Sequence, residues 1–177
     1  MKIIIIGIVV ALLAFAYILL KDKYIFLNIK LKNVEEKIRS TLVKRKALIE
    51  DSEKIIKDII KTDKDIYENI GNINDPSLTM IELDRNLLVY INEFYLIKDK
   101  YKKLNSNEDF LNIAFAINDT EDLLNGYKEY YNDICEKYNK LISMFPINIF
   151  SVIKRRKKKE FFDKKSIHDN DYSEFKY

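Results

Sequence analysis

The side chains that most often perform catalysis are scarce in this chain. Its 177 residues include one cysteine, Cys135, and one histidine, His168, near the C-terminus. A nucleophilic cysteine needs a neighbouring base, and a helical di-iron centre needs Glu-x-x-His pairs. Glycine-rich phosphate loops are missing as well. We therefore expect no enzymatic activity, no metal site and no cofactor, and we expect Cys135 to pack as a small buried hydrophobe.

A polar ribbon is the first candidate interaction feature. Four asparagines recur every seven residues, so they occupy one position of a helical heptad, with two charged residues on the same flank. The ribbon consists of Asn118, Glu121, Asn125, Lys128, Asn132 and Asn139. Such a stripe can pair with another helix or with a partner chain, and a solvated helix face is the alternative. Arg45 falls in the apolar phase of an earlier helix, where an unpaired charge is unfavourable. We therefore expect it to meet Glu121 or a ribbon asparagine.

A run of cations is the second candidate. It comprises Lys154, Arg155, Arg156, Lys157, Lys158 and Lys159. The net charge of +3 turns negative without these six residues, so the chain as a whole is not expected to bind nucleic acid. Apolar side chains flank the run, so the run could lie on anionic lipid. Plain solvation is an equally open interpretation of such a charge run, and an acidic partner or nucleic acid is a further alternative.

Tyr131 and Tyr138 lie seven residues apart in an apolar heptad position. Their rings are expected in the core, with the hydroxyls reaching water or a partner. A stacking site for a ligand is the weaker interpretation.

Residues 3–20 carry no charged side chain. As a helix they span roughly 27 Å, enough to cross a bilayer core of about 30 Å with little to spare. We interpret residues 1–22 as a single transmembrane anchor. Cleavage after Ala14-Phe15-Ala16, as in a signal peptide, would instead give a secreted protein, but the apolar run continues past that motif.

Positive charge indicates which side of the membrane carries the remaining chain. Only Lys2 precedes the apolar run, whereas many cations follow it: Lys21, Lys23, Lys30, Lys32, Lys37 and Arg39. The positive-inside rule then places the bulk of the chain in the cytoplasm.

Helical spacing of apolar residues predicts an all-α bundle over residues 23–146. Three long helices are expected, over about 23–70, 76–104 and 107–145. Gly71 is the expected end of the first, and Asp75 before Pro76 is the expected start of the second, with Thr79 and Glu82 as a rival capping box. Ser106 and Asp109 could cap the third. With short loops, these helices would alternate in direction.

The third helix has the clearest pattern, a heptad repeat typical of coiled-coil packing that also leaves self-association open. The heptad residues are Phe110, Ile117, Leu124, Tyr131, Tyr138 and Phe145, with Ile113, Thr120, Tyr127, Ile134 and Leu141 three residues further on. Pro146 would end the helix. Residues 147–162 could add a short basic amphipathic helix, and residues 163–177 are expected to be disordered. Alternating helices would put the end of the third far from the membrane, so the basic run would reach lipid only by folding back.

Several motifs resemble the LemA family. They are Asn107-Glu108-Asp109-Phe110, Thr120-Glu121, Tyr130-Tyr131-Asn132-Asp133, Tyr138-Asn139, Phe145-Pro146 and Phe161-Phe162, and more loosely Ile38, Leu42, Lys44-Arg45 and Leu48-Ile49. The chain departs from the family pattern at Lys128, where an arginine is usual, and at Ala47, Glu50 and Asp51. The resemblance covers roughly residues 1–163.

The resemblance implies an N-terminally anchored bacterial membrane protein with a long helical bundle, and it carries no enzymatic activity over. We therefore expect a membrane-anchored scaffold or protein-interaction module. An enzyme with its site on the polar face of the third helix is the alternative from a different class.

Overall fold

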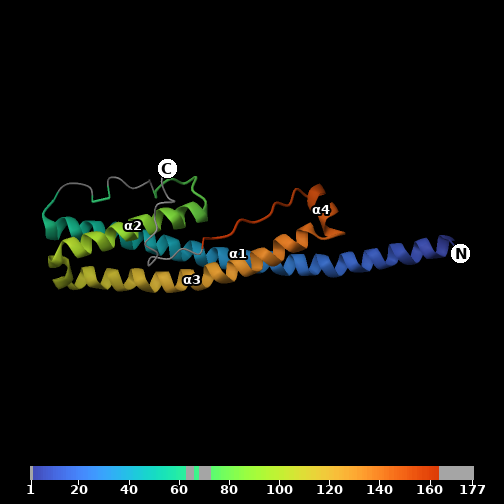
Figure 1. The fold of residues 1–177 in the computed structure, drawn as a ribbon, viewed down its shortest axis with the longest axis horizontal. Coiled ribbons are helices and arrows are strands. Elements are labelled where there is room, and N and C mark those ends of the chain that lie inside the picture. Colours follow the sequence, from blue (N-terminus) through green and yellow to red (C-terminus); the bar gives the residue numbers. More distant parts are fainter. Residues whose placement is uncertain (1, 63–65, 68–72, 164–177) are drawn as a thin grey trace. The chain divides into compact units, whose positions relative to one another are not determined.

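The computed structural model describes residues 2–62, 66–67 and 73–163. These residues form helices and no strand, which confirms the predicted all-α fold (Figure 1). The helices are α1 (Lys2–Ile60), α2 (Met80–Lys100), the 3-10 helix η1 (Lys102–Ser106), α3 (Glu108–Ser143) and α4 (Ile147–Ile153).

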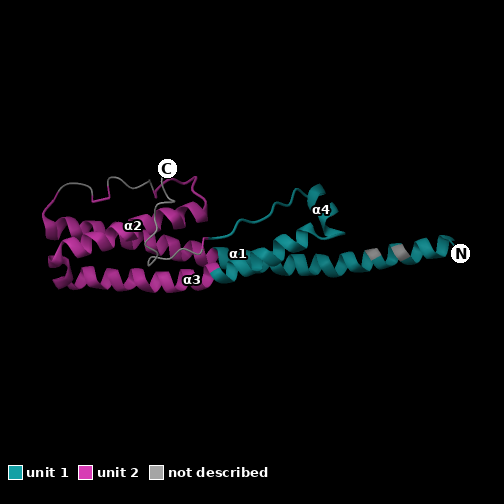
Figure 2. Cartoon of the chain, viewed as in Figure 1, with its two compact units in different colours: residues 1–35, 129–162 teal, residues 36–128, 163–177 magenta. Residues whose placement is uncertain are grey.

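The chain divides into two compact units, shown in Figure 2. Unit 1 comprises residues 1–35 and 129–162, and unit 2 comprises residues 36–128 and 163–177. Each of the long helices α1 and α3 contributes one part to each unit.

In unit 2, α1 and α3 run in opposite directions. Arg45 of α1 contacts Glu121 of α3, and Lys37, two turns earlier in α1, lies over the ring of Tyr127, 5.6 Å from its centroid. Because the earlier residue of α1 meets the later residue of α3, the two helices are antiparallel.

The helices α2 and α3 are antiparallel as well. Asp84 near the start of α2 contacts Lys128, whereas the ring of Phe94 stacks 4.9 Å from that of Phe110 at the start of α3. Both α1 and α2 thus oppose α3, so α1 and α2 run parallel to each other. The strict alternation expected from sequence is therefore wrong for α1 and α2, because α1 ends at Ile60 and α2 begins only at Met80, a longer separation than a short turn.

The helix α1 ends at Ile60, well before the expected end near residue 70. Lys61 adopts a left-handed conformation (φ 57°), and the N–H of Thr62 donates to the carbonyl of Lys57 over 3.3 Å. This is the Schellman arrangement that usually employs glycine. Gly71 lies outside the described residues.

The start of α2 follows the rival prediction. The Thr79 hydroxyl accepts from the N–H of Glu82 (3.2 Å), and the Glu82 carboxylate accepts from the N–H of Thr79 (2.8 Å), which forms a reciprocal capping box. Asp75 instead accepts from the N–H of Ser77 (2.8 Å) in the preceding turn. Pro76 is therefore not the first residue of the helix.

The helix α3 buries most of its heptad residues, whereas Ile113 and Tyr127 are half-buried. Phe110, Ile117 and Leu124 are buried in unit 2, and Tyr131 and Tyr138 are buried in unit 1. Asn107, one residue after the expected cap, accepts from the N–H of Phe110 over 2.8 Å.

The expected last heptad position, Phe145, is 61% exposed because α3 already ends at Ser143. The short helix α4 follows, within the segment where a fourth helix was expected, and residues 157–163 then continue without helix. Residues 164–177, for which we expected disorder, lie outside the described part of the chain. Asp163 is described, and its carboxylate accepts from Nη2 of Arg85 over 3.2 Å.

Among the described residues, α1 alone is long and apolar enough to cross a membrane. Its most apolar window has no buried residue.

Candidate functional site

Arg45 projects from α1 into the interior of unit 2, where its side chain is fully buried. Its Nη2 donates to Oε2 of Glu121 over 2.6 Å, and its Nε donates to the Thr120 hydroxyl over 3.1 Å. That hydroxyl donates in turn to the carbonyl of Ile117 (2.6 Å). A buried cation is tolerated when it is paired and hydrogen bonded in this way. The predicted contact between Arg45 and Glu121 is present.

The first asparagine of the ribbon joins α3 to α2. The hydroxyl of Tyr95 donates to Oδ1 of Asn118 over 2.7 Å. Burial raises the pKa of Tyr95, and the positive charge of Arg45 acts in the opposite direction. Tyr95 therefore stays protonated and remains a hydrogen-bond donor at neutral pH.

A second buried ion pair links α2 and α3. Nζ of Lys128 lies 2.9 Å from Oδ2 of Asp84, and the two side chains are 4% and 3% exposed. Lys128 was expected on the polar ribbon, whereas its partner Asp84 was not predicted. A signal was available, because Asp84 continues the apolar phase of Leu87, Leu88 and Ile91 one turn back. A carboxylate in that phase requires a buried cation.

The ribbon asparagines differ in their environments. Asn125 is exposed, whereas Asn132 and Asn139 hold the segment after α4 within unit 1. Nδ2 of Asn139 donates to the carbonyl of Lys159, and the N–H of Lys159 donates back to Oδ1, both over 2.8 Å. Asn132 makes the same two contacts with the backbone of Phe162, both over 2.9 Å. We call these two residues the amide clamp.

Cys135 lies between the two clamp residues on α3. It is buried, and its Sγ donates to the carbonyl of Lys159 over 3.3 Å. Burial raises the pKa of the thiol, which a hydrogen bond from Asn139 partly opposes. The side chain is therefore a protonated packing residue, as expected, and is poorly suited to act as a nucleophile.

Tyr131 and Tyr138 occupy the core of unit 1. The ring of Tyr131 meets that of Phe162 edge-on, with centroids 5.1 Å apart, and Tyr138 lies 5.7 Å from Tyr24 of α1. Burial raises the pKa of both tyrosines, to about 12 for Tyr138, where the neighbouring Tyr24 adds to the effect. The rings pack against other aromatic rings, in line with the core interpretation.

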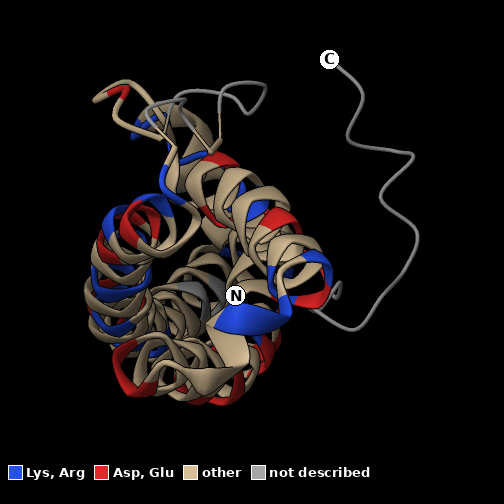
Figure 3. Ribbon diagram, turned by 90° about the vertical axis from the view of Figure 1, so that its left-hand side faces the viewer, with Lys and Arg blue, Asp and Glu red and all other residues tan. Residues whose placement is uncertain are grey.

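The cations of the basic run have two kinds of environment. Arg156 lies over the ring of Tyr24, 3.7 Å from its centroid, and Lys159 pairs with Glu35 over 2.8 Å. The other four are exposed: Lys154, Arg155, Lys157 and Lys158. Both signs of charge also occur on the helices, as Figure 3 shows.

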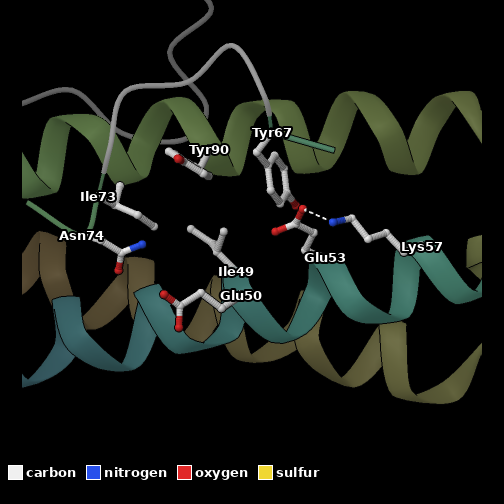
Figure 4. A pocket seen from close by; sticks show the side chains of 8 residues that line it. All are labelled: Ile49, Glu50, Glu53, Lys57, Tyr67, Ile73, Asn74 and Tyr90. Atoms are coloured by element: carbon white, nitrogen blue, oxygen red, sulfur yellow. Dashed lines mark ion pairs between the residues drawn. The ribbon is translucent and has the colours of Figure 1, made fainter. Parts of the chain in front are cut away.

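Unit 2 contains a pocket of about 310 Å³, which the sequence did not predict (Figure 4). Its lining residues are Ile49, Glu50, Glu53, Lys57, Tyr67, Ile73, Asn74 and Tyr90. The Glu53 carboxylate binds Nζ of Lys57 (2.9 Å) and accepts from the N–H of Ile66 (3.3 Å). The hydroxyls of Tyr67 and Ser52 lie 3.0 Å apart. These contacts hold residues 66 and 67 against α1.

Within the described ranges, no group of three or more histidine, cysteine, aspartate or glutamate side chains is arranged to hold a metal ion. The buried charged residues of unit 2 are instead paired between helices, and the amide clamp of unit 1 binds the chain's own backbone. The arrangement can hold helices and an extended segment together.

A model of the LemA family matches residues 34–173. The chain belongs to the LemA family. The match begins after the apolar segment, so it does not include residues 3–20. It covers residues 36–128 and 163–173 of unit 2 and residues 129–162 of unit 1. Arg45, the amide clamp and the basic run thus all lie within the LemA match. No curated protein and no solved structure gave a significant match.

Proposed function

We propose that this LemA-family chain is a non-enzymatic interaction module held at the bacterial cytoplasmic membrane by residues 3–20, with the bundle on the cytoplasmic side and bound to a protein partner. The observation that carries the proposal is the exposure of the apolar start of α1. Ile3 is 85% exposed and Phe15 is 61% exposed within the chain. A continuous apolar surface of this kind is unfavourable in water and favourable in a bilayer.

The cations after the apolar segment support the cytoplasmic orientation. Lys21, Lys23 and Lys30 follow it within a short distance, whereas only Lys2 precedes it. Positive charge is retained on the cytoplasmic side of a membrane.

Two observations support binding over catalysis. Arg45 and Lys128, which could have taken part in chemistry, are buried and paired with carboxylates. Unit 2 also exposes large apolar side chains, among them Val43 (57%) and Phe115 (67%). Exposed apolar side chains of this size are candidate contacts for another protein.

Membrane fractionation tests the anchor. The natural chain should stay in the membrane through an alkaline wash, and its intact mass should include residues 1–20. A Leu12→Arg variant should lose membrane retention, because arginine in mid-helix disfavours insertion by about 2.5–3.5 kcal/mol. Phe115→Arg, which adds the same charge in unit 2, should stay bound. A soluble natural chain with its first residues removed would overturn the anchor and indicate a secreted protein.

Two further measurements test orientation and partner. A protease added to intact spheroplasts should spare the bundle and should digest it after permeabilisation. A photo-crosslinker at position 115 should capture a defined second protein, and the Val43→Arg variant, with the crosslinker in place, should lose that capture while unfolding at the same denaturant concentration. Recovery of self-crosslinked chains only would contradict a heterologous partner.

A further inference from the structure

The segment from α4 to residue 158 exposes apolar and cationic side chains together. Ile149, Val152 and Ile153 are 51%, 78% and 71% exposed. Lys154, Arg155, Lys157 and Lys158 directly follow and are exposed too. Exposed apolar side chains beside a cluster of cations are typical of segments that lie in the headgroup region of a bilayer.

Contacts within unit 1 hold this segment next to the start of the bundle. Arg156 lies 3.7 Å from the ring centroid of Tyr24. Tyr24 is four residues after Leu20, the last residue of the apolar run, which is about 6 Å along a helix. Tyrosine at this distance from a membrane span is typical of the bilayer interface.

The position of the segment follows from the direction of α3. Tyr138 packs against Tyr24, so the later part of α3 runs back along the early part of α1. The segment after α3 is consequently near the apolar run, and the folding back that alternating helices would have required is unnecessary. Unit 1 alone provides this geometry.

The six cations of the basic run fall into two groups, two that contact unit 1 and four that are exposed. Arg156 and Lys159 fasten the segment to α1, through Tyr24 and Glu35. The Asn139 contacts with Lys159 fasten it to α3. The four remaining cations are exposed, so they are available to an anionic ligand outside unit 1.

We propose that α4 and residues 154–158 form a second membrane contact, which inserts Val152 and Ile153 at the surface of the bilayer and places the four exposed cations against anionic phospholipid headgroups. The proposal rests on the membrane anchor proposed above. A bilayer is favoured over a nucleic acid or an acidic protein because the apolar side chains lie beside the cations and because α1 enters the membrane one turn from Tyr24.

Fluorescence of the full chain in vesicles tests the contact. An environment-sensitive label is placed at Val152→Cys in a Cys135→Ser background, and the chain is reconstituted in phosphatidylcholine vesicles with or without phosphatidylglycerol. The label should shift to the blue and be quenched by brominated lipid when phosphatidylglycerol is present. A label at Phe115→Cys, which replaces a similarly exposed side chain in unit 2, should not respond to phosphatidylglycerol.

Charge variants provide the matched control. The triple variant Lys154→Gln, Arg155→Gln and Lys158→Gln should reduce the fraction of inserted label roughly tenfold or more, since each cation adds to attraction by anionic lipid. High salt should have a similar effect. The triple variant Lys44→Gln, Lys102→Gln and Lys103→Gln removes the same charge from exposed positions of unit 2 and should behave like the parent.

The outcomes separate this contact from the anchor. A chain that floats with phosphatidylcholine vesicles but shows the same emission at position 152 with and without phosphatidylglycerol would overturn the second contact alone. A blue shift that requires added nucleic acid or protein would overturn it as well. A chain that does not float with phosphatidylcholine vesicles would overturn the anchor and, with it, this proposal.

Discussion

Arg45 and Glu121 are 76 positions apart in the chain, yet their Nη2 and Oε2 atoms lie 2.6 Å apart inside unit 2. The side chains are 0% and 5% exposed, so the ion pair is shielded from water. The pair therefore fixes the register of α1 against α3. Apolar side chains alone would specify that register less strictly, since they tolerate sliding.

Removing one member of this pair should destabilise the protein strongly. Glu121→Leu or Arg45→Met should each lower the free energy of unfolding by about 3–5 kcal/mol, because an unpaired charge remains buried. The double variant should recover much of the loss. Denaturant unfolding of the full chain in detergent micelles measures all three. Single variants whose free energy of unfolding lies within about 1 kcal/mol of the parent's would contradict a buried pair.

The Asp84 and Lys128 pair should respond unequally to its two single substitutions. Lys128→Met leaves a short buried carboxylate that cannot reach water, so we expect a loss of about 3 kcal/mol or more. Asp84→Leu leaves a lysine whose long stem can extend toward solvent, so its loss should be smaller. The same unfolding measurement compares the two variants. Equal losses would indicate that Lys128 is as confined as Asp84.

Release of the amide clamp should expose Cys135. Because burial raises the pKa of the thiol, little thiolate is present at neutral pH and alkylation should be slow in the parent. The double variant Asn132→Ala and Asn139→Ala should accelerate alkylation by about tenfold or more as the segment leaves α3. Asn125→Ala changes an exposed residue at the same heptad position and serves as the control. Unchanged alkylation in the double variant would contradict the clamp.

The capping box of α2 should make stability depend on pH. The Thr79 backbone N–H that donates to Glu82 holds the pKa of that carboxyl below its ordinary value of 4.5. Since the folded-state pKa is depressed, the contribution is complete above the unfolded-state pKa and is lost as pH falls through the folded-state pKa. Unfolding measured over an acid pH series should show this slope in the parent and a smaller one in Glu82→Gln.

A separate substitution tests the other half of the capping box. Thr79→Ala removes the acceptor of the Glu82 N–H and should lower stability by about 1 kcal/mol. Serine at the same position keeps the acceptor and should restore most of the loss. An alanine variant as stable as the parent would show that α2 begins without help from its cap.

Much of the fold follows from pattern alone. The heptads of α3 place Phe110, Ile117 and Leu124 in the core, as they predict. The contact between Arg45 and Glu121 could be predicted because a buried cation needs an anion, and the polar ribbon has a glutamate beside the apolar heptad residues. Such features can be predicted because periodicity and charge pairing act over whole helices.

Other features depend on single backbone choices that the composition does not reveal. The end of α1 uses Lys61 in a left-handed conformation, where glycine is the usual signal. Because α1 ends ten residues earlier than expected, its separation from α2 is longer than a short turn, and α2 runs parallel to α1 instead of antiparallel to it. The backbone segment that Asn132 and Asn139 bind could not be predicted either, because an extended segment has no periodic pattern in its sequence.

The clamp on the segment after α4 recognises main-chain atoms. Asn139 binds the backbone N–H and C=O of Lys159, and Asn132 binds the same two groups of Phe162. None of these four hydrogen bonds involves the side chain of Lys159 or Phe162. The identity of the gripped residues can consequently drift with all four bonds intact. Proline is the exception, since it would delete an N–H donor and loosen one of the two grips.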